Sequence, residues 1–221
     1  MFKFLVTFAL IGPILIGFGQ DTIPFKDQVY SIIQRNDKLW DATRETIVFT
    51  GSSSIALWTD LEKRFPEHHI LNAGFGGSHA SHLFHYLDTL VLRYQPKKVF
   101  IYEGDNDLLA KKTPKNILAT LKEIVTRLKT GAPEREIILI SAKPSPSRWK
   151  LRKQYQRLNR KIKRTAMQDS QLYFVDIWTP MLEDKKIRSN IFIEDGLHMN
   201  PLGYDIWYKA VRSLVDPSIH P

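Results

Sequence analysis

Short apolar segments alternate with longer amphipathic segments along most of this chain, and no other feature constrains its fold as much. The apolar segments predict strands over 46–50, 69–72, 98–102, 136–141 and 172–175. Helical patterns predict helices over 55–64, 81–93, 114–129, 149–167 and 201–215, with one more over 24–40 packed on the outside. Because these strands lack a polar face, the pattern indicates an α/β protein with a parallel sheet covered by helices on both sides.

The composition is that of one globular domain. The chain has 221 residues, of which 43% are hydrophobic and 25% are charged, so it is neither disordered nor a protein with several membrane spans. It contains no cysteine. Neither disulfides nor a lipid anchor attached through cysteine are therefore expected, and stability has to come from the hydrophobic core.

The first nineteen residues have the pattern of an export signal. Lys3 precedes an apolar run over 4–18, and the small residues Gly17 and Gly19 lie at the end of that run. A membrane anchor is the alternative, but the run is shorter than the ~20 residues that span a bilayer, and a Gly-Pro pair interrupts it. We expect 1–19 to be a signal peptide, 20–44 to be a helical extension, and the mature protein to be exported, either periplasmic or secreted.

Polar and glycine-rich segments follow the predicted strands, at the edge of the sheet where open α/β folds bind ligands. "GSSS" follows the first strand, "NAGFGGSH" the second and "EGDND" the third, while "DGLH" comes after the last strand and leads into the final helix. Hydrolysis of an ester through a serine needs a base, a carboxylate that orients the base, and donors for the oxyanion. These four segments together contain all of these groups.

Each of these roles has a candidate residue. Ser53, at the strand-to-helix turn, is the candidate nucleophile. His198 is the candidate base, and Asp195, three residues before it, is the carboxylate that orients it. The candidate oxyanion-hole donors are the N–H groups of Ser53 and Gly77 and the side-chain amide of Asn106.

These segments resemble the motifs of the SGNH hydrolases, also called the GDSL esterase and lipase family. The family's G-D-S, N-x-G-x-x-G-like, G-x-N-D and D-x-x-H motifs correspond to residues 51–53, 72–77, 104–107 and 195–198. Ser52 departs from the pattern, because it stands where the family has an aspartate. That aspartate is not a triad member, so the departure changes the support of the turn and not the catalytic set.

The resemblance implies a flavodoxin-like three-layer α/β/α sandwich with a five-stranded parallel sheet over residues 45–217. It also implies a serine esterase that needs neither a metal nor an organic cofactor. Within the family, the chain resembles the branch of the platelet-activating-factor acetylhydrolases. The short connections favour small acyl groups, such as acetate on carbohydrate. Lysophospholipid hydrolysis and acyl transfer to a sugar hydroxyl are alternatives on the same residues. An inactive protein that binds glycan or lipid is an alternative of another class.

The segment "KPSPSRW" follows the fourth strand, at the same edge as the other motifs. Its two prolines predict a stiff loop. Ser147, Arg148 and Trp149 in this segment are therefore candidates for the wall of a substrate cleft.

Two groups of residues could suggest a metal, but neither has the spacing of a metal site. Asp105 and Asp107 lie close together, yet in the resembled motif Asp107 is a structural hydrogen-bond acceptor. His79, His82 and His85 recur every three residues, whereas metal-binding helices use i and i+4 spacing with a further ligand elsewhere. We therefore expect no metal.

The net charge of +9 comes from one segment. Ten basic residues and no acidic residue lie within 143–164, and the rest of the chain has 22 basic and 23 acidic residues. One explanation of this basic segment is that it forms the solvated face of a helix whose apolar side chains face the core. Another is attraction to anionic lipids or acidic polysaccharide. Nucleic acid is the least favoured partner, because of the export signal and because no nucleic-acid-binding motif is present.

Overall fold

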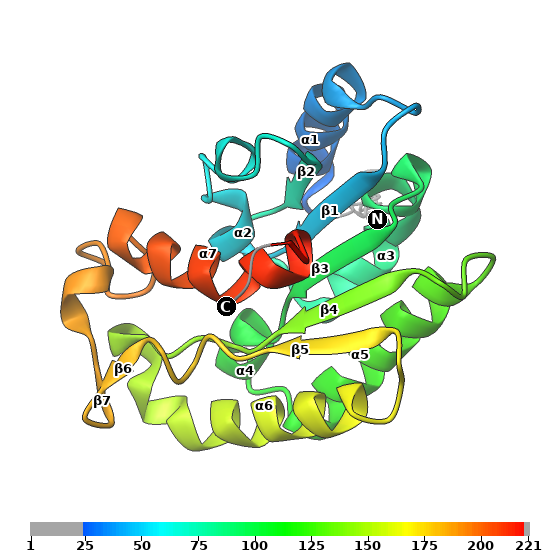
Figure 1. Cartoon of the computed structure of the whole chain (residues 1–221). Helices are drawn as coiled ribbons and strands as arrows, with labels where there is room; N and C mark the ends of the chain where they lie inside the picture. The colour runs from blue at the N-terminus through cyan, green and yellow to red at the C-terminus, as the bar shows by residue number, and fades with distance from the viewer. Residues whose placement is uncertain (1–23, 219–221) are drawn as a thin grey trace, which may run out of the picture.

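Five parallel strands form the central sheet of the protein (Figure 1). The computed structural model describes residues 24–218, and the expected signal peptide over 1–19 lies outside them. The strands are β1 (Thr46–Gly51), β2 (His69–Gly74), β3 (Lys98–Tyr102), β4 (Glu136–Ile140) and β5 (Leu172–Val175). Their order is β2-β1-β3-β4-β5, and every neighbouring pair is parallel. The predicted strands are confirmed, with small shifts at their ends.

Helices cover both faces of this sheet, as predicted. One face carries α1 (Lys26–Leu39), α3 (Ala80–Leu90), α5 (Pro114–Lys129) and α6 (Arg152–Ala166). The opposite face carries α2 (Ser53–Ala56) and α7 (Pro201–Val215). The result is the three-layer α/β/α sandwich that the resemblance implied (Figure 1). Within residues 24–218, no helix combines the length and the apolar character that crossing a membrane requires.

Alternate side chains of each strand enter two hydrophobic cores, one on each face of the sheet. Val48 enters the core under α1, α3, α5 and α6, whereas Phe49 and Phe100 enter the core under α7. The rings of these two phenylalanines stack with centroids 4.2 Å apart. Trp58 and Trp207 are fully buried in the same core and meet edge to face, an arrangement that aromatic rings favour.

Helix α1 confirms the helix predicted over 24–40 and attaches to the edge of the sheet. The Asn36 side chain donates to the main-chain carbonyl of Asn72 in β2 at 3.1 Å, and Arg35 donates to the same oxygen. At the start of the helix, the Phe25 ring lies close to Gly77. The N-terminal extension therefore supports the segment that carries a candidate oxyanion-hole donor.

The helix predicted over 55–64 is wrong. Helix α2 ends at Ala56, and only a 3-10 helix at Glu62–Arg64 follows it. The Asn72 side chain donates to the carbonyl of Ile55 at 2.8 Å. In a continuing helix that carbonyl would accept the N–H of the residue four positions later, so the chain leaves the helical path here.

Several short elements were not predicted. Helix α4 (Asp105–Leu109) follows β3, and β6 (Leu182–Glu183) pairs with β7 (Lys186–Ile187) in a hairpin. Further 3-10 helices lie at Leu92–Tyr94, Pro146–Leu151 and Ser189–Ile191. In place of the single helix predicted over 149–167, the chain forms the 3-10 helix at Pro146–Leu151 and then α6. Both α4 and the segment 146–151 contribute to the site described next.

Candidate active site

Two glycines allow the chain to turn sharply where β1 and β3 end. Gly51 has a φ of 130°, and a Cβ there would lie 2.0 Å from the carbonyl oxygen of Tyr102 in β3. Gly104 has a φ of 107°. Only glycine adopts such angles readily. Because β1 and β3 are neighbours, these turns place Ser53, the first residue of α2, near Asn106 in α4.

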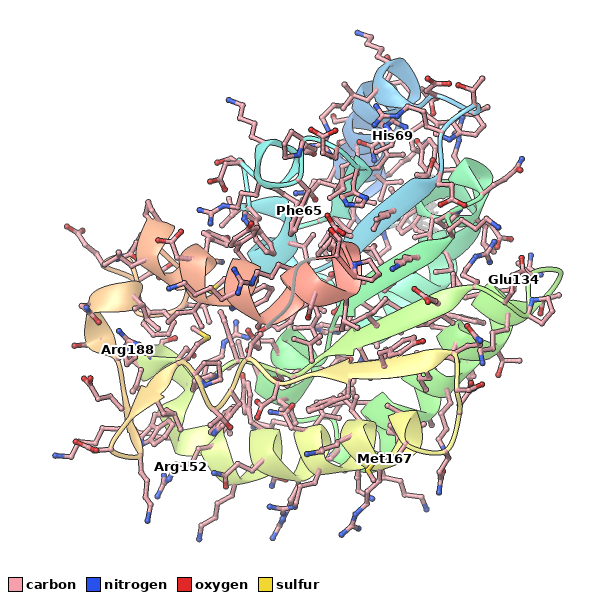
Figure 2. The ribbon with its side chains drawn as sticks, viewed as in Figure 1. Phe65, His69, Glu134, Arg152, Met167 and Arg188 are labelled. Carbon is pink, nitrogen blue, oxygen red and sulfur yellow. The ribbon has the colours of Figure 1, made fainter. Side chains whose placement is uncertain are left out.

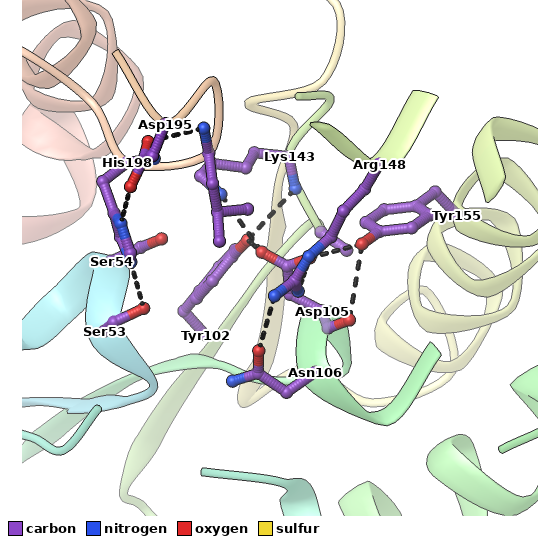
Figure 3. Close-up of polar contacts among 12 residues, drawn as sticks. Ser53, Ser54, Tyr102, Asp105, Asn106, Lys143, Arg148, Tyr155, Asp195 and His198 are labelled. Atoms are coloured by element: carbon purple, nitrogen blue, oxygen red, sulfur yellow. Dashed lines mark hydrogen bonds and ion pairs between the residues drawn. The ribbon is translucent and has the colours of Figure 1, made fainter. Parts of the chain in front are cut away.

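A serine, a histidine and an aspartate form a chain of hydrogen bonds at this edge (Figure 3). His198 Nε2 lies 2.9 Å from Ser53 Oγ, and His198 Nδ1 lies 2.5 Å from Asp195 Oδ2. The other carboxylate oxygen of Asp195 accepts the N–H groups of Leu197 and His198 at 2.8 and 2.9 Å. Burial opposes ionisation, but these donors and the imidazole lower the pKa of Asp195 to about 2. The ionised carboxylate can therefore hold His198 with Nε2 toward the serine.

The short loop before α7 sets the geometry of the histidine and the aspartate locally. The N–H of Ile193 donates to the carbonyl of His198 at 2.9 Å and closes the loop. The N–H of Ser147 donates to the carbonyl of Gly196 at 3.0 Å. The segment after β4 thus contacts the loop that carries the candidate base.

The three candidate oxyanion-hole groups also lie at this edge. Gly77 has a φ of 80° in the turn after β2. Within the part of the chain that the structure describes, the N–H groups of Ser53 and Gly77 donate to no other group. The Asn106 amide donates one hydrogen to the carbonyl of Ser78 at 2.9 Å, and its oxygen accepts from Arg148 Nη2 at 3.0 Å. One amide hydrogen of Asn106 therefore stays available for a ligand.

Next to Asn106, the buried carboxylate of Asp105 accepts several donors (Figure 3). Asp105 accepts from Arg148 Nη1 at 2.6 Å, from Lys143 Nζ at 3.1 Å and from the Tyr102 hydroxyl at 2.9 Å, and the Tyr155 hydroxyl also donates to it. Burial alone would raise the pKa of Asp105, but Lys143 and Arg148 hold it well below its usual range. The guanidinium therefore bridges an ionised carboxylate and the amide.

The three residues predicted to wall a cleft occupy different positions. Ser147 is exposed beside the loop of His198. Arg148 has only 9% of its side chain exposed and is held by Asp105 and Asn106. Trp149 is half-buried and stacks on Trp178 with centroids 5.9 Å apart. Sequence reasoning placed Arg148 at the correct edge but missed its partners, because they lie more than 40 residues away.

Ser52 supports the turn through its main chain. Its N–H donates to the carbonyl of Tyr102 at 3.1 Å, and its carbonyl accepts from Ile55 at 2.9 Å and from Ala56 at 3.2 Å. The residue is buried and precedes the first residue of α2. These bonds hold β1 against β3 at the point where Ser53 begins the helix.

A second buried carboxyl group lies under the segment of Gly77. Ser78 Oγ donates to Glu103 Oε1 at 2.6 Å, and Glu103 is 1% exposed. Burial raises the pKa of Glu103 well above its usual value, because no cation compensates for the lost hydration. The pKa shift of Glu103 is opposite in direction to that of Asp105, two residues later. The sequence motifs did not single out this residue.

The residues considered as metal ligands serve the fold in other ways. Asp107 accepts the N–H of Ala80 at 3.1 Å, which confirms it as a structural acceptor. The ring of His82 accepts the N–H of His79 at 3.1 Å, and the two rings stack at 4.8 Å. Over residues 24–218, no group of three or more potential ligands is placed to hold a metal ion.

A parallel α/β/α sandwich with this arrangement at its carboxyl edge defines the SGNH class of hydrolases. The chain belongs to the GDSL-like Lipase/Acylhydrolase family, whose model matches residues 40–206. This confirms the resemblance seen in the motifs. Because the family consists of ester-hydrolysing enzymes, the protein is a hydrolase that acts on ester bonds.

Relatives and solved structures agree with this assignment. The chain is 25% identical over 174 residues to platelet-activating factor acetylhydrolase IB subunit alpha1 from Pongo abelii, covering 76% of this chain and 74% of the relative. The fold is similar to a GDSL-like lipase from Bacteroides thetaiotaomicron, with a TM-score of 0.74, 19% identity, and coverage of 86% and 98% of the two chains. It is also similar to a catalytic mutant of an acetylxylan esterase from Geobacillus stearothermophilus, with a TM-score of 0.64, 20% identity, and coverage of 77% and 94%.

Proposed function

We propose that the protein is a serine esterase that removes short acyl groups, with Ser53, His198 and Asp195 as its catalytic triad. The hydrogen-bonded row from Ser53 Oγ through His198 to Asp195, at 2.9 and 2.5 Å, carries this proposal. A serine hydroxyl is a weak nucleophile unless an oriented base accepts its proton. The hydrogen bonds of His198 to Ser53 and to Asp195 suit these roles of base and orienting carboxylate.

The reaction follows from this arrangement. Ser53 Oγ attacks the ester carbonyl carbon while His198 Nε2 takes the hydroxyl proton. His198 then gives that proton to the leaving alcohol oxygen as the bond between carbon and oxygen breaks. A water molecule, deprotonated by His198, attacks the acyl-serine, and the proton returns to Ser53 as the acid leaves.

The oxyanion that forms in each step would be bound by the N–H groups of Ser53 and Gly77 and by the free amide hydrogen of Asn106. The N–H groups of Ser53 and Gly77 donate to no other acceptor among the described residues. The amide of Asn106 is oriented by its hydrogen bonds with Ser78 and Arg148. Donors fixed in advance stabilise developing charge strongly, because they need no reorganisation during the reaction. In this account Arg148 is a positioning residue.

The acyl group is proposed to be acetate or another short acid on a carbohydrate. The names of an acetylxylan esterase and of an acetylhydrolase among the similar proteins favour acetyl groups.

The pattern of residues 1–19 supports export of the protein, and N-terminal sequencing of the protein from the medium or periplasm would test this proposal.

A panel of substrates tests the proposal. p-Nitrophenyl esters from acetate to dodecanoate, then acetylated xylo-oligosaccharides and lysophosphatidylcholine, are assayed with the native protein and with Ser53→Ala. We expect the highest kcat/KM with acetate and loss of nearly all turnover in the variant. A maximum with long chains or with lysophosphatidylcholine would favour a lysophospholipase. Transfer of acetyl to added sugar in place of release as acetate would favour an acyltransferase.

A further inference from the structure

A groove lined by basic side chains lies beside the site, between the segment after α4 and helix α6. Its volume is about 620 Å³. Its lining includes no aspartate or glutamate. The cations on one wall are Lys111, Lys112 and Lys115, and those on the other are Arg157, Arg160, Lys161 and Arg164. Figure 2 shows nitrogen-tipped side chains standing out from α6 between Arg152 and Met167.

Most of these cations lack an acidic partner. Of these seven groove cations, only Lys112 has an ion pair within residues 24–218, with Asp107 at 3.0 Å. Each of the four groove cations of α6 has another of them three or four positions away, a spacing at which like charges destabilise a helix. Some exposed cations elsewhere do have an acidic partner, as Arg127 has in Asp88 at 2.8 Å. The groove therefore gathers six cations that have no ion pair among the described residues.

The amino end of α5 adds to the positive field. Thr113, Pro114 and Lys115 line the groove, and they begin a 16-residue helix. Acidic residues stabilise the first turn of a helix, but here that turn contains none and carries Lys115 instead. An anion in the groove would compensate both the helix end and the side chains of α6.

The groove is close to the proposed oxyanion hole. Leu108, which lines it, belongs to the same short helix as Asn106. Lys111 follows the end of this helix, at Leu109, by two residues. Leu151, also in the lining, belongs to the 3-10 helix that carries Arg148. A chain-like molecule could therefore reach both places.

We propose that this groove binds a linear acidic polysaccharide with carboxylates on successive sugars. Cations on two facing walls suit a chain lying between them, whereas a flat membrane would reach only the rims. No aromatic side chain lines the groove, so it offers no platform for stacking nucleic-acid bases. Thr113 and Gln154 add polar groups for sugar hydroxyls. Binding does not depend on Ser53; together with the proposed function it gives the esterase an acidic glycan as substrate.

The test compares two triple variants with the same loss of charge. The groove variant is Lys115→Gln, Arg157→Gln and Lys161→Gln. The control variant is Lys150→Gln, Lys153→Gln and Lys163→Gln, at exposed positions outside the groove lining. Binding of fluorescein-labelled oligogalacturonate is measured by anisotropy at 0.15 M salt, with neutral dextran, phosphatidylglycerol vesicles and a single-stranded oligonucleotide as competitors.

We expect the groove variant to raise the Kd for oligogalacturonate about tenfold, since each exposed charge pair contributes a factor of about 1.4 to 5, and the control to change it less than twofold. Both variants should hydrolyse p-nitrophenyl acetate at the native rate, which separates this result from a failure of the proposed function. Equal losses in the two variants, no binding by the native protein, or stronger competition by vesicles or oligonucleotide would each overturn the proposal.

Discussion

Arg148 offers a sharp test of how the proposed oxyanion hole is assembled. Its Nη1 donates to Asp105 at 2.6 Å and its Nη2 donates to the Asn106 oxygen at 3.0 Å, while the Ser78 carbonyl holds the other end of the amide at 2.9 Å. Replacing Arg148 by methionine removes one of the two restraints on the amide. Lys143 still neutralises Asp105. We therefore expect catalysis to suffer more than folding.

The magnitude follows from the bond that is lost. A hydrogen bond to a charged donor contributes about 1.5–3 kcal/mol, and about 1.4 kcal/mol is a factor of ten in rate. Arg148→Met should therefore lower kcat for p-nitrophenyl acetate about 10- to 100-fold with little change in KM. Asn106→Ala, which removes the donor itself, should lower kcat by about 10²–10³.

The double variant tests whether the two residues act together. If Arg148 works by positioning Asn106, adding Arg148→Met to Asn106→Ala should lower kcat little further. Arg148→Lys is the matched control: it keeps a charge for Asp105, but one nitrogen replaces the two that reach separate acceptors. We expect this variant to melt near the native temperature with reduced kcat. Additive losses in the double variant, or native kcat in Arg148→Lys, would refute the positioning role.

Three further predictions concern other parts of the site. Because burial raises the pKa of Glu103 above its usual value of 4.5, native stability should fall as the pH rises above 4.5, by up to about 1.4 kcal/mol per pH unit. Glu103→Gln should make this fall less steep in urea unfolding at pH 5, 6 and 7; parallel profiles of the variant and the native protein would contradict it. Gly51→Ala should destabilise the fold by about 3 kcal/mol or more, because its Cβ would meet the Tyr102 carbonyl. Gly131→Ala is the control and should cost less, since Gly131 also has a positive φ but no atom lies within 4 Å of the new Cβ; equal losses of Tm would contradict the close approach of Gly51 to Tyr102. Asp195→Asn should lower kcat about 10⁴-fold without changing Tm much, and native rates would show that another group orients His198.

The sheet and the placement of the motifs could be predicted because they depend on local patterns. Strand segments without a polar face, alternating with helices, admit few arrangements, and parallel connections put all strand ends on one edge. The helix over 114–129 has the predicted ends, since Thr113 caps it and Pro114 begins it. Asp195 and His198 could be paired because only two residues of one loop separate them.

The interactions that were missed join distant parts of the chain. The early end of α2 depends on Asn72, which lies 17 residues beyond Ile55. The contacts of Arg148 with Asp105 and Asn106 span 43 and 42 residues. The sequence pointed to an excess of charge over 143–164, but only the fold shows that residues 111–115 supply a facing wall. Such side-chain partnerships leave no periodic signal in the sequence.

The identity of the nucleophile is the central claim, and covalent labelling tests it most directly. The native protein is treated with a fluorophosphonate, digested, and mapped by mass spectrometry. We predict one adduct, on Ser53, which forms much more slowly in His198→Ala and is absent in Ser53→Ala. An adduct on a different residue, or undiminished esterase activity in Ser53→Ala, would contradict the account.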